Sequence, residues 1–308
     1  MKEAEAILAG DRRALARGLS LVEAGGPDAV TLMDRIVGRT GRARRIGITG
    51  PPGAGKSTLV ARIMQLYRES GLSVAVVAVD PTSPFTGGAL LGDRHRMSHE
   101  AHDEGVFVRS LASRGNLGGL SRAAPACMDL MDAAGFERVI VETVGVGQSE
   151  VEVAGTADSV VVVLSPESGD AVQAMKAGLL EVADILCVNK SDREGADLLA
   201  ATLDSMLDLR APRDGWRPPV VLTCASEAAG PLREELARHA GWLREGDRLA
   251  RRRLAGLEAR LRSLVGQLVA ERLVGGADAL LKREAAGVAA GERSVMHAAR
   301  RALEEILS

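Results

Sequence analysis

The chain has 308 residues, of which 46% are hydrophobic and 26% charged, a composition typical of an ordinary soluble protein. Because 39 basic side chains are balanced by 41 acidic ones, the charge gives no reason to expect nucleic acid or an acidic membrane as the main partner. Aromatic residues make up only 2% of the chain, which therefore lacks a platform for stacking bases and does not fit a single-stranded nucleic-acid binder.

The sequence also predicts a cytoplasmic protein without a membrane partner. No run approaches the roughly 18 apolar residues that a membrane span needs, and the acidic start Met1–Glu5 lacks the apolar stretch of a secretion signal. Cys127, Cys187 and Cys224 lie far apart and mostly within apolar runs, as expected of reduced thiols rather than of a disulfide framework.

Residues 1–43 are predicted to form a helical N-terminal extension. Apolar residues recur at roughly helical spacing from Ala4 to Val37, with one break at Gly25-Gly26-Pro27. A basic stretch follows at residues 41–45, and after it the pattern changes.

Residues 44–240 are predicted to form an α/β domain, because short β-rich runs alternate there with helical segments. Val160–Leu164 is apolar at every position, which indicates a strand buried on both faces, as in a mainly parallel central sheet flanked by helices. The expected strands are Ile46–Thr49, Val74–Val79, Val106–Leu111, Val139–Thr143, Val160–Leu164, Ile185–Val188 and Val220–Thr223.

A complete phosphate-binding loop joins the first of these strands to a predicted helix, and it assigns the domain to the P-loop nucleotide hydrolases. A glycine-rich strand-to-helix loop lets backbone N–H groups point into one concavity, and the helix N-terminus adds favourable partial charge. We expect Lys56 to reach the β- and γ-phosphates, Ser57 to bind Mg²⁺ and Thr58 to contact the α-phosphate. The loop consists of Gly50, Pro51, Pro52, Gly53, Ala54, Gly55, Lys56 and Ser57.

Two carboxylates after the second strand are expected near the metal ion. Asp80 closes the strand, and Asp93 follows a glycine-bearing stretch. Either residue alone would suit a turn or a helix cap, but the two together favour Mg²⁺ binding. Residues 81–92 between them are predicted to form a switch loop that is ordered by nucleotide.

The fourth predicted strand ends in a carboxylate with glycines beyond it. Glu142 can hold Mg²⁺ through water, and Gly145 gives the backbone a hinge that can respond to the γ-phosphate. Gln148 is a candidate for orienting the attacking water, although a glutamine at a helix start is as often a polar surface contact.

An N-K-x-D element at residues 189–192, directly after an apolar strand, predicts that the base is guanine. The Asp192 carboxylate can accept hydrogen bonds from guanine N1–H and from the exocyclic amine, a donor pair that adenine lacks. We expect Asn189 to brace the loop and the stem of Lys190 to cover the base. Cys224 and Ala225 follow the last strand. Either a backbone N–H there donates to guanine O6, or these residues only mark the end of the strand and have no role in base binding.

Residues 241–308 are predicted to form a C-terminal helical arm. Leucines step by three and four between arginines, which is typical of a seam on a long helix. The helix either packs on the chain's own core or serves as a dimerisation arm, and the long continuation without a strand signal favours the arm. The leucines are Leu254, Leu257, Leu261, Leu264 and Leu268.

Taken together, these motifs resemble the MeaB/ArgK family of P-loop G proteins, whose members act as chaperones for adenosylcobalamin-dependent acyl-CoA mutases. The resemblance implies a SIMIBI-type G domain and Mg²⁺-dependent hydrolysis of GTP to GDP and phosphate. It is most specific in Glu142–Glu150. The strings that carry it are Gly10–Arg17, Gly50–Thr58, Val79–Pro84, Gly87-Gly88, Leu91–Arg94, Val108–Ser110, Ser113–Gly115, Glu142–Glu150 and Asn189–Asp192.

The resemblance further implies that Asp170–Gly178 is an extra switch, through which the family senses nucleotide and signals to its mutase. Gln173 and Lys176 would then face the active site and the partner, although their spacing alone also suits a solvated helix face. A homodimer is implied as well, acting as a metallochaperone that gates the loading and protection of the cofactor. The implied partner is methylmalonyl-CoA mutase or a relative, with an adenosyltransferase as a further candidate.

The main alternative is a nickel-insertion GTPase of the urease or hydrogenase maturation type, which needs Cys or His ligands for its metal. Three histidines would fall on one side of a helix, but cysteine partners are missing. A regulatory switch or a signal-recognition-type targeting GTPase is a second alternative, and the absence of a Met-rich or basic RNA-binding domain argues against targeting. The histidines are His95, His99 and His102, and the candidate arginine fingers are Arg94, Arg109 and Arg114.

Overall fold

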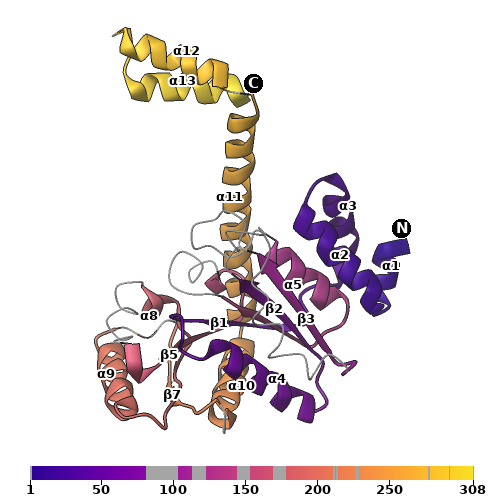
Figure 1. The fold of residues 1–308 in the computed structure, drawn as a ribbon, viewed down its shortest axis with the longest axis vertical. Coiled ribbons are helices and arrows are strands. Elements are labelled where there is room, and N and C mark those ends of the chain that lie inside the picture. Colours follow the sequence, from indigo (N-terminus) through magenta and orange to yellow (C-terminus); the bar gives the residue numbers. More distant parts are fainter. Residues whose placement is uncertain are drawn as a thin grey trace. The chain divides into compact units, whose positions relative to one another are not determined.

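The computed structural model shows two compact units, Met1–Arg253 and Leu254–Ser308 (Figure 1). The described residues are 2–80, 103–112, 123–143, 153–168, 178–210, 212, 214–225, 229–276, 278–290 and 292–307.

The first unit is a central sheet flanked by helices. Its strands are β1 (Arg44–Thr49), β2 (Val74–Asp80), β3 (Val106–Ala112), β4 (Arg138–Glu142), β5 (Ser159–Leu164), β6 (Ile185–Val188) and β7 (Val220–Leu222). Its helices are α1 (Lys2–Leu8), α2 (Arg12–Ala24), α3 (Pro27–Ile36), α4 (Lys56–Glu69), α5 (Ala124–Ala133), α8 (Leu179–Val182), α9 (Ala196–Asp208), α10 (Gly230–Arg244) and the start of α11 (Arg248–Gly276), with short 3₁₀ helices η1 (Val37–Arg39) and η3 (Pro166–Ser168).

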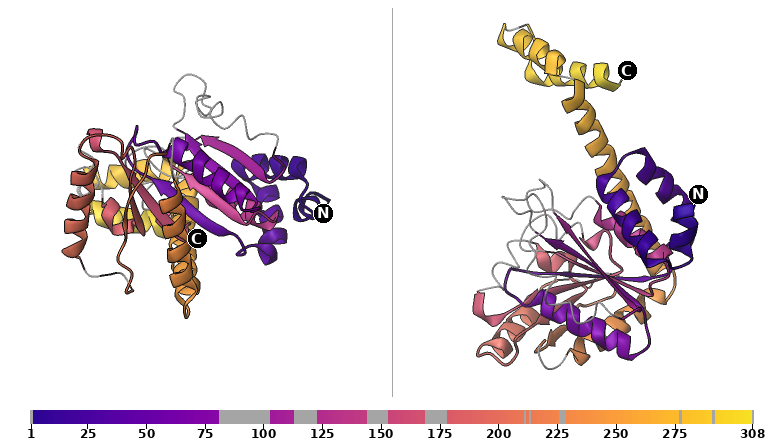
Figure 2. Two further views of the ribbon diagram at one scale, coloured as in Figure 1. Left: turned by 90° about the horizontal axis from the view of Figure 1, so that it is seen from below. Right: turned by 45° about the vertical axis from the view of Figure 1, so that its right-hand side comes forward.

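The sheet has seven strands in the order β3-β2-β4-β1-β5-β6-β7, and every neighbouring pair is parallel. This confirms the predicted α/β class with a parallel sheet flanked by helices (Figure 2). Each predicted strand begins and ends within two residues of an observed one. The prediction succeeded because both faces of the sheet are buried, which makes the strands continuously apolar.

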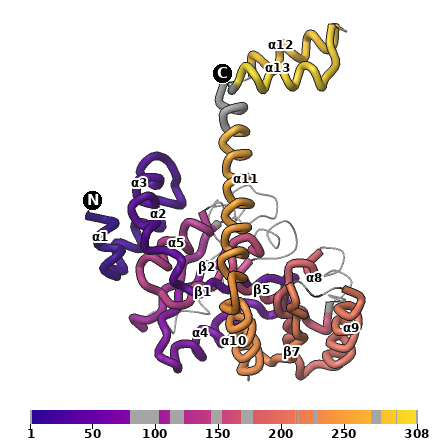
Figure 3. Tube along the Cα trace, turned by 180° about the vertical axis from the view of Figure 1, so that it is seen from behind, coloured from indigo at the N-terminus to yellow at the C-terminus, as the bar shows by residue number. Residues whose placement is uncertain are grey.

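Alternate residues of β2, β4, β5 and β6 enter two different cores. In β5, Val161 and Val163 belong to one core, whereas Val160 and Val162 belong to the other. α4 and α10 cover the first face and lie side by side (Figure 3). α5 and α9 contribute to the core on the second face.

The N-terminal helices are part of the first unit. α1, α2 and α3 contact one another, and each contacts α5. Asp11 caps α2, because its carboxylate accepts a hydrogen bond from the Ala14 backbone N–H at 2.8 Å, and this bond lowers the pKa of Asp11. Gly25 and Gly26, with φ of 76° and 90°, separate α2 from α3, which confirms the predicted break.

Two buried carboxylates tie the first turns of α11 to the sheet. Asp184 is 3% exposed and accepts hydrogen bonds from two guanidinium nitrogens of Arg252, at 2.8 and 2.5 Å, and from the Val160 N–H at 2.8 Å. Asp158 is 4% exposed and accepts two hydrogen bonds from Arg253, at 2.8 and 2.7 Å. Both pairs are bidentate, the strongest arrangement of a guanidinium with a carboxylate.

Replacing Asp184 with alanine is therefore expected to destabilise the fold strongly. The substitution leaves Arg252, whose side chain is 15% exposed, without its carboxylate. Removing one partner of a buried ion pair costs about 3–5 kcal/mol, and we expect the free energy of unfolding in urea to fall by about that amount. Asp204→Ala is the control, because this carboxylate is 54% exposed and its pair with Arg217 contributes at most about 1 kcal/mol. Equal losses in the two variants would show that the Asp184 pair has no special role.

His239 of α10 is a buried neutral imidazole. Its side chain is fully buried, and its ring lies against Trp216 and Trp242, with centroids 4.7 and 5.5 Å away. Its Nδ1 is 2.8 Å from Ser159 Oγ. Burial lowers the pKa of His239 to about 4, and the opposing attraction of Asp184 is the weaker effect. The ring is therefore uncharged at neutral pH, and the 3.7 Å approach of Nε2 to Asp184 Oδ1 is not an ion pair there.

This burial predicts a loss of stability in mild acid. The unfolded chain protonates this histidine near its ordinary pKa of about 6.5, whereas the folded chain does so only near 4. The free energy of unfolding therefore falls as the pH drops through this window, by about 2 kcal/mol from this residue between about pH 7 and about pH 5. His239→Gln should lose that part of the pH dependence in urea unfolding, and the exposed control His297→Gln should keep it. The same pH dependence in both variants would contradict the assignment.

The second unit continues α11 and adds α12 (Asp278–Ala289) and α13 (Val295–Leu307), which pack together. Between them Glu284, 3% exposed, accepts a hydrogen bond from Arg293 at 2.7 Å, which lowers the pKa of this glutamate. Arg283 and Glu305 add an ion pair at 2.5 Å. Within the described part of the chain, no helix is both long enough and apolar enough to cross a membrane.

Candidate active site

The phosphate-binding loop follows β1 and is pressed against two neighbouring elements. Gly50 has a φ of 139°, and a Cβ atom there would lie 2.0 Å from the backbone oxygen of Val163 in β5. At Gly55, with a φ of 88°, a Cβ atom would lie 2.3 Å from Nδ2 of Asn189. Only glycine fits at these two positions, which explains why the loop needs the spacing seen in the sequence.

The start of α4 completes a cradle that fits a phosphate group. The helix begins at Lys56, and Gly55 precedes it without capping it through a side chain. The first N–H groups of an α-helix have no partner within the helix, and they carry its partial positive charge. A phosphate supplies both the acceptor oxygens and the negative charge that such a helix start favours.

Lys56 is held inside this loop. Its side chain is 7% exposed, and Nζ donates hydrogen bonds to the carbonyl oxygens of Gly50 and Pro51, each at 2.9 Å. The predicted strand, loop and helix are thus all present, and the ammonium lies within the loop.

Two oxygen ligands suited to Mg²⁺ meet next to the loop. Ser57 Oγ donates a hydrogen bond to Glu142 Oε1 at 2.6 Å, and Glu142 is 5% exposed at the end of β4. Beside them, Thr143 Oγ1 donates to Thr49 Oγ1 at 2.8 Å, which joins the ends of β4 and β1. Mg²⁺ prefers hydroxyl, carboxylate and water oxygens, so this pair of side chains fits that ion.

The other predicted metal and switch residues are only partly described. Asp80 is the last residue of β2, two positions beyond the Ala78–Glu142 register pair, but its side chain is not among those described. Among the described residues, no group of three or more His, Cys, Asp and Glu could hold a metal ion. The predicted residues outside the described ranges are Asp93, Gln148, Gln173 and Lys176, together with the three histidines His95, His99 and His102.

Asn189 joins the phosphate loop to the predicted base loop. It is 2% exposed, its Nδ2 donates to the Ala54 carbonyl oxygen at 2.8 Å, and its Oδ1 accepts from the Ala225 N–H at 3.0 Å. The bracing expected of Asn189 therefore extends to two loops. The sequence names the Ala225 N–H as a possible donor to guanine O6, and in this structure it donates to Asn189 Oδ1.

Lys190 and Asp192 lie on the outer side of the same loop. Lys190 has a positive φ of 59°, and its Nζ is 2.6 Å from Glu167 Oε2. This contact lowers the pKa of Glu167. Asp192 is 53% exposed, and its Oδ1 lies 3.4 Å from Cys224 Sγ, so the two predicted base-binding segments do meet.

Glu167 is a site residue that the sequence analysis missed. It also lies 3.2 Å from Arg193, so it positions two basic side chains beside the base loop. Its only signal in the sequence is its position three residues after the end of β5, at the edge of the sheet where β1 and β6 also end. Of the three candidate arginine fingers, Arg109 pairs with Glu23 of α2 at 2.7 Å, and Arg94 and Arg114 lie outside the described residues.

Comparison with known proteins shows the family to which the chain belongs. The family model for "Methylmalonyl Co-A mutase-associated GTPase MeaB" matches residues 15–278. A GTPase of Pyrococcus horikoshii is 47% identical over 87% of this chain and 86% of its own length, and the GTPase ArgK of Escherichia coli is 44% identical over 72% and 69%. A crystal structure of an LAO/AO transport system kinase superimposes with a TM-score of 0.76 at 30% identity, over 100% of this chain and 97% of that one. The chain therefore belongs to the MeaB family of methylmalonyl-CoA mutase-associated GTPases.

Proposed function

We propose that this GTPase hydrolyses GTP with Mg²⁺ and that its nucleotide state gates cofactor loading and protection of an adenosylcobalamin-dependent acyl-CoA mutase. The single observation that carries the nucleotide assignment is Asn189, which hydrogen-bonds to Ala54 and to Ala225. These two bonds support a single site that combines the phosphate cradle with the proposed guanine-recognition loop. Family membership favours the mutase chaperone over the nickel-insertion alternative.

In the proposed mechanism, water attacks the γ-phosphorus in line and the bond to the β,γ-bridging oxygen breaks, which leaves GDP and phosphate. Lys56 and the backbone N–H groups at the start of α4 hold the phosphates. Ser57 and Glu142, with Asp80 and Asp93, would hold Mg²⁺, which neutralises phosphate charge when bound. Asp192 selects guanine, and Thr58 and Lys190 contact the α-phosphate and the base.

The switch segments in this proposal are residues 81–94, 145–150 and 170–178. Gln148 would orient the water, and Gln173 and Lys176 would carry the nucleotide state to the mutase. The three cysteines are free, and burial raises the pKa of Cys127 and Cys187 to about 12. Free thiols suit a reducing compartment such as the cytoplasm, where we place the protein.

The coupling to a mutase is tested by adding the acyl-CoA mutase of the same organism to the purified GTPase. We expect the rate of phosphate release from GTP to rise with mutase concentration and to saturate. An unrelated acyl-CoA-binding enzyme at equal concentration is the control. An unchanged rate would reject the coupling while leaving GTP hydrolysis intact. The same assay with an adenosyltransferase added tests that further partner.

A homodimer through α11 is the second part of the proposal. Five leucines along this helix are 42–64% exposed, and their spacing of three and four residues forms a coiled-coil seam. We expect Leu257→Glu/Leu261→Glu to convert a dimer into a monomer in sedimentation velocity, whereas Ser263→Glu, an exposed substitution outside the seam, leaves the dimer intact. A monomeric wild type, or a dimer that survives the double substitution, would contradict this. The seam consists of Leu254, Leu257, Leu261, Leu264 and Leu268.

A further inference from the structure

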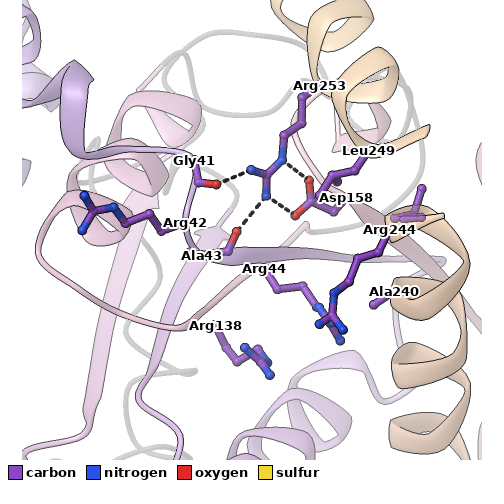
Figure 4. A pocket seen from close by; sticks show the side chains of 11 residues that line it. Gly41, Arg42, Ala43, Arg44, Arg138, Asp158, Ala240, Arg244, Leu249 and Arg253 are labelled. Carbon is purple, nitrogen blue, oxygen red and sulfur yellow. Dashed lines mark hydrogen bonds and ion pairs between the residues drawn. The ribbon is translucent and has the colours of Figure 1, made fainter. Parts of the chain in front are cut away.

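A cavity of about 150 Å³ lies at the edge of the sheet opposite to the phosphate loop (Figure 4). Arg44 and Arg138 line it from the starts of β1 and β4, and Arg244 lines it from the last turn of α10. β1 runs from Arg44 to the loop that begins at Gly50, so this cavity and the nucleotide site occupy the two ends of one strand.

The carboxylate that lines the cavity is already occupied. Asp158 accepts the two hydrogen bonds from Arg253 and a third from the Arg45 backbone N–H at 2.9 Å. Arg253 also donates to the carbonyl oxygens of Gly41 and Ala43. The contacts of Arg253 with Asp158, Gly41 and Ala43 are the dashed lines in Figure 4, and none of them involves Arg44, Arg138 or Arg244.

Arg44 and Arg138 are a like-charged pair on adjacent strands. They are register partners in the parallel ladder of β1 and β4, and neighbouring strands lie about 4.8 Å apart. Like charges at directly opposed positions destabilise a sheet. Both arginines are half-buried, and burial together with the charges of Arg138 and Arg244 lowers the pKa of Arg44.

None of the three arginines forms an ion pair with any described residue. Arg138 stacks over the Tyr67 ring at 5.2 Å from the centroid and donates to the Glu137 carbonyl oxygen at 2.9 Å, but its buried Nε has no hydrogen-bond partner. The charge of Arg244 acts on Arg44, and the two guanidinium groups overlap in the view of Figure 4, whereas Arg42 points away. A basic residue in the last turn of a helix complements the helix dipole, which explains Arg244 but not the paired strand arginines.

We propose that the cavity of Arg44, Arg138 and Arg244 is a second anion site that binds the phosphate group of a small molecule. A guanidinium offers donors in a fork that matches phosphate oxygens, and three such groups converge here with one orphaned donor among them. The volume far exceeds the roughly 10–15 Å³ that a single water molecule needs. A bound phosphate relieves the repulsion between the arginines, next to the point where Arg253 fastens α11.

The test is titration calorimetry of the full-length protein saturated with GDP, so that the nucleotide site is filled. Inorganic phosphate and glycerol 3-phosphate are the two probes, and tighter binding of the second identifies a phosphomonoester rather than free phosphate as the ligand. Arg44→Gln and Arg244→Gln are compared with Arg251→Gln, an exposed arginine of α11 that does not line the cavity. Arg244→Gln is an exposed substitution at a helix end, so folding of this variant is not at risk.

We expect saturable binding of one equivalent by the wild type, weakened about tenfold or more in both cavity variants because each loses charge-assisted hydrogen bonds, and unchanged in the control. In thermal unfolding at low ionic strength, Arg44→Gln without phosphate should be at least as stable as the wild type, and phosphate should no longer stabilise it. The proposal is overturned if the GDP-bound wild type binds neither probe, or if all three variants bind phosphate as the wild type does.

Discussion

Replacement of Lys56 by alanine is expected to reduce GTP turnover by at least on the order of 10²–10³-fold. The side chain is 7% exposed within the phosphate loop, where Nζ is held by the carbonyl oxygens of Gly50 and Pro51. Its ammonium would stabilise charge on the transferred phosphoryl group, and removal of one preorganised stabilising donor typically costs about 10²–10³ in kcat. Phosphate release at saturating GTP measures the effect.

Two controls separate this effect from loss of folding. Lys282→Ala removes an exposed lysine of α12 and should leave turnover unchanged. The melting temperature of Lys56→Ala, measured without nucleotide, should stay near that of the wild type, because Nζ donates to carbonyl oxygens of its own loop, those of Gly50 and Pro51. Turnover within a factor of about three of the wild type would remove Lys56 from the mechanism.

Replacement of Asp192 by asparagine is expected to move base preference from guanine toward xanthine. The carboxylate accepts from two donors of guanine, whereas the amide of asparagine presents one acceptor and one donor, which matches the N1–H and the C2 oxygen of xanthine. A site built to hydrogen-bond its ligand discriminates strongly against a mismatch, so the ratio of kcat/KM for GTP to that for XTP should fall by on the order of 10² or more.

Asp197→Asn is the matched control for this substitution. It makes the same chemical change at an exposed position in the first turn of α9, close in sequence to the base loop. GTP preference should be unaffected there. Unaltered GTP preference in Asp192→Asn as well would show that another residue reads the base.

The strands and the phosphate loop could be predicted because their signals are local. The continuous run of valines in β5 and the glycines before Lys56 each express a constraint that acts within a few residues, and the observed β1, loop and α4 follow it. The N-K-x-D element was found for the same reason, because it directly follows a buried strand, β6.

The contacts between distant segments could not be predicted from the sequence. Asn189 hydrogen-bonds to Ala54, which is 135 residues away in the sequence, and Arg252 to Asp184, which is 68 residues away. The sequence around each residue therefore does not indicate its partner. Arg109, a candidate arginine finger, likewise pairs with Glu23 of α2 across 86 residues, a contact that no local pattern indicates.

The most direct test of the central claim, that one site built around Asn189 and Asp192 makes this chain a guanine-specific hydrolase, is the comparison of GTP with ATP. The measurement is phosphate release by the wild-type protein with Mg²⁺ over a range of each nucleotide. A kcat/KM for GTP that exceeds the value for ATP by on the order of 10³ or more is the predicted result. Comparable values for GTP and ATP, or release from neither, would contradict it.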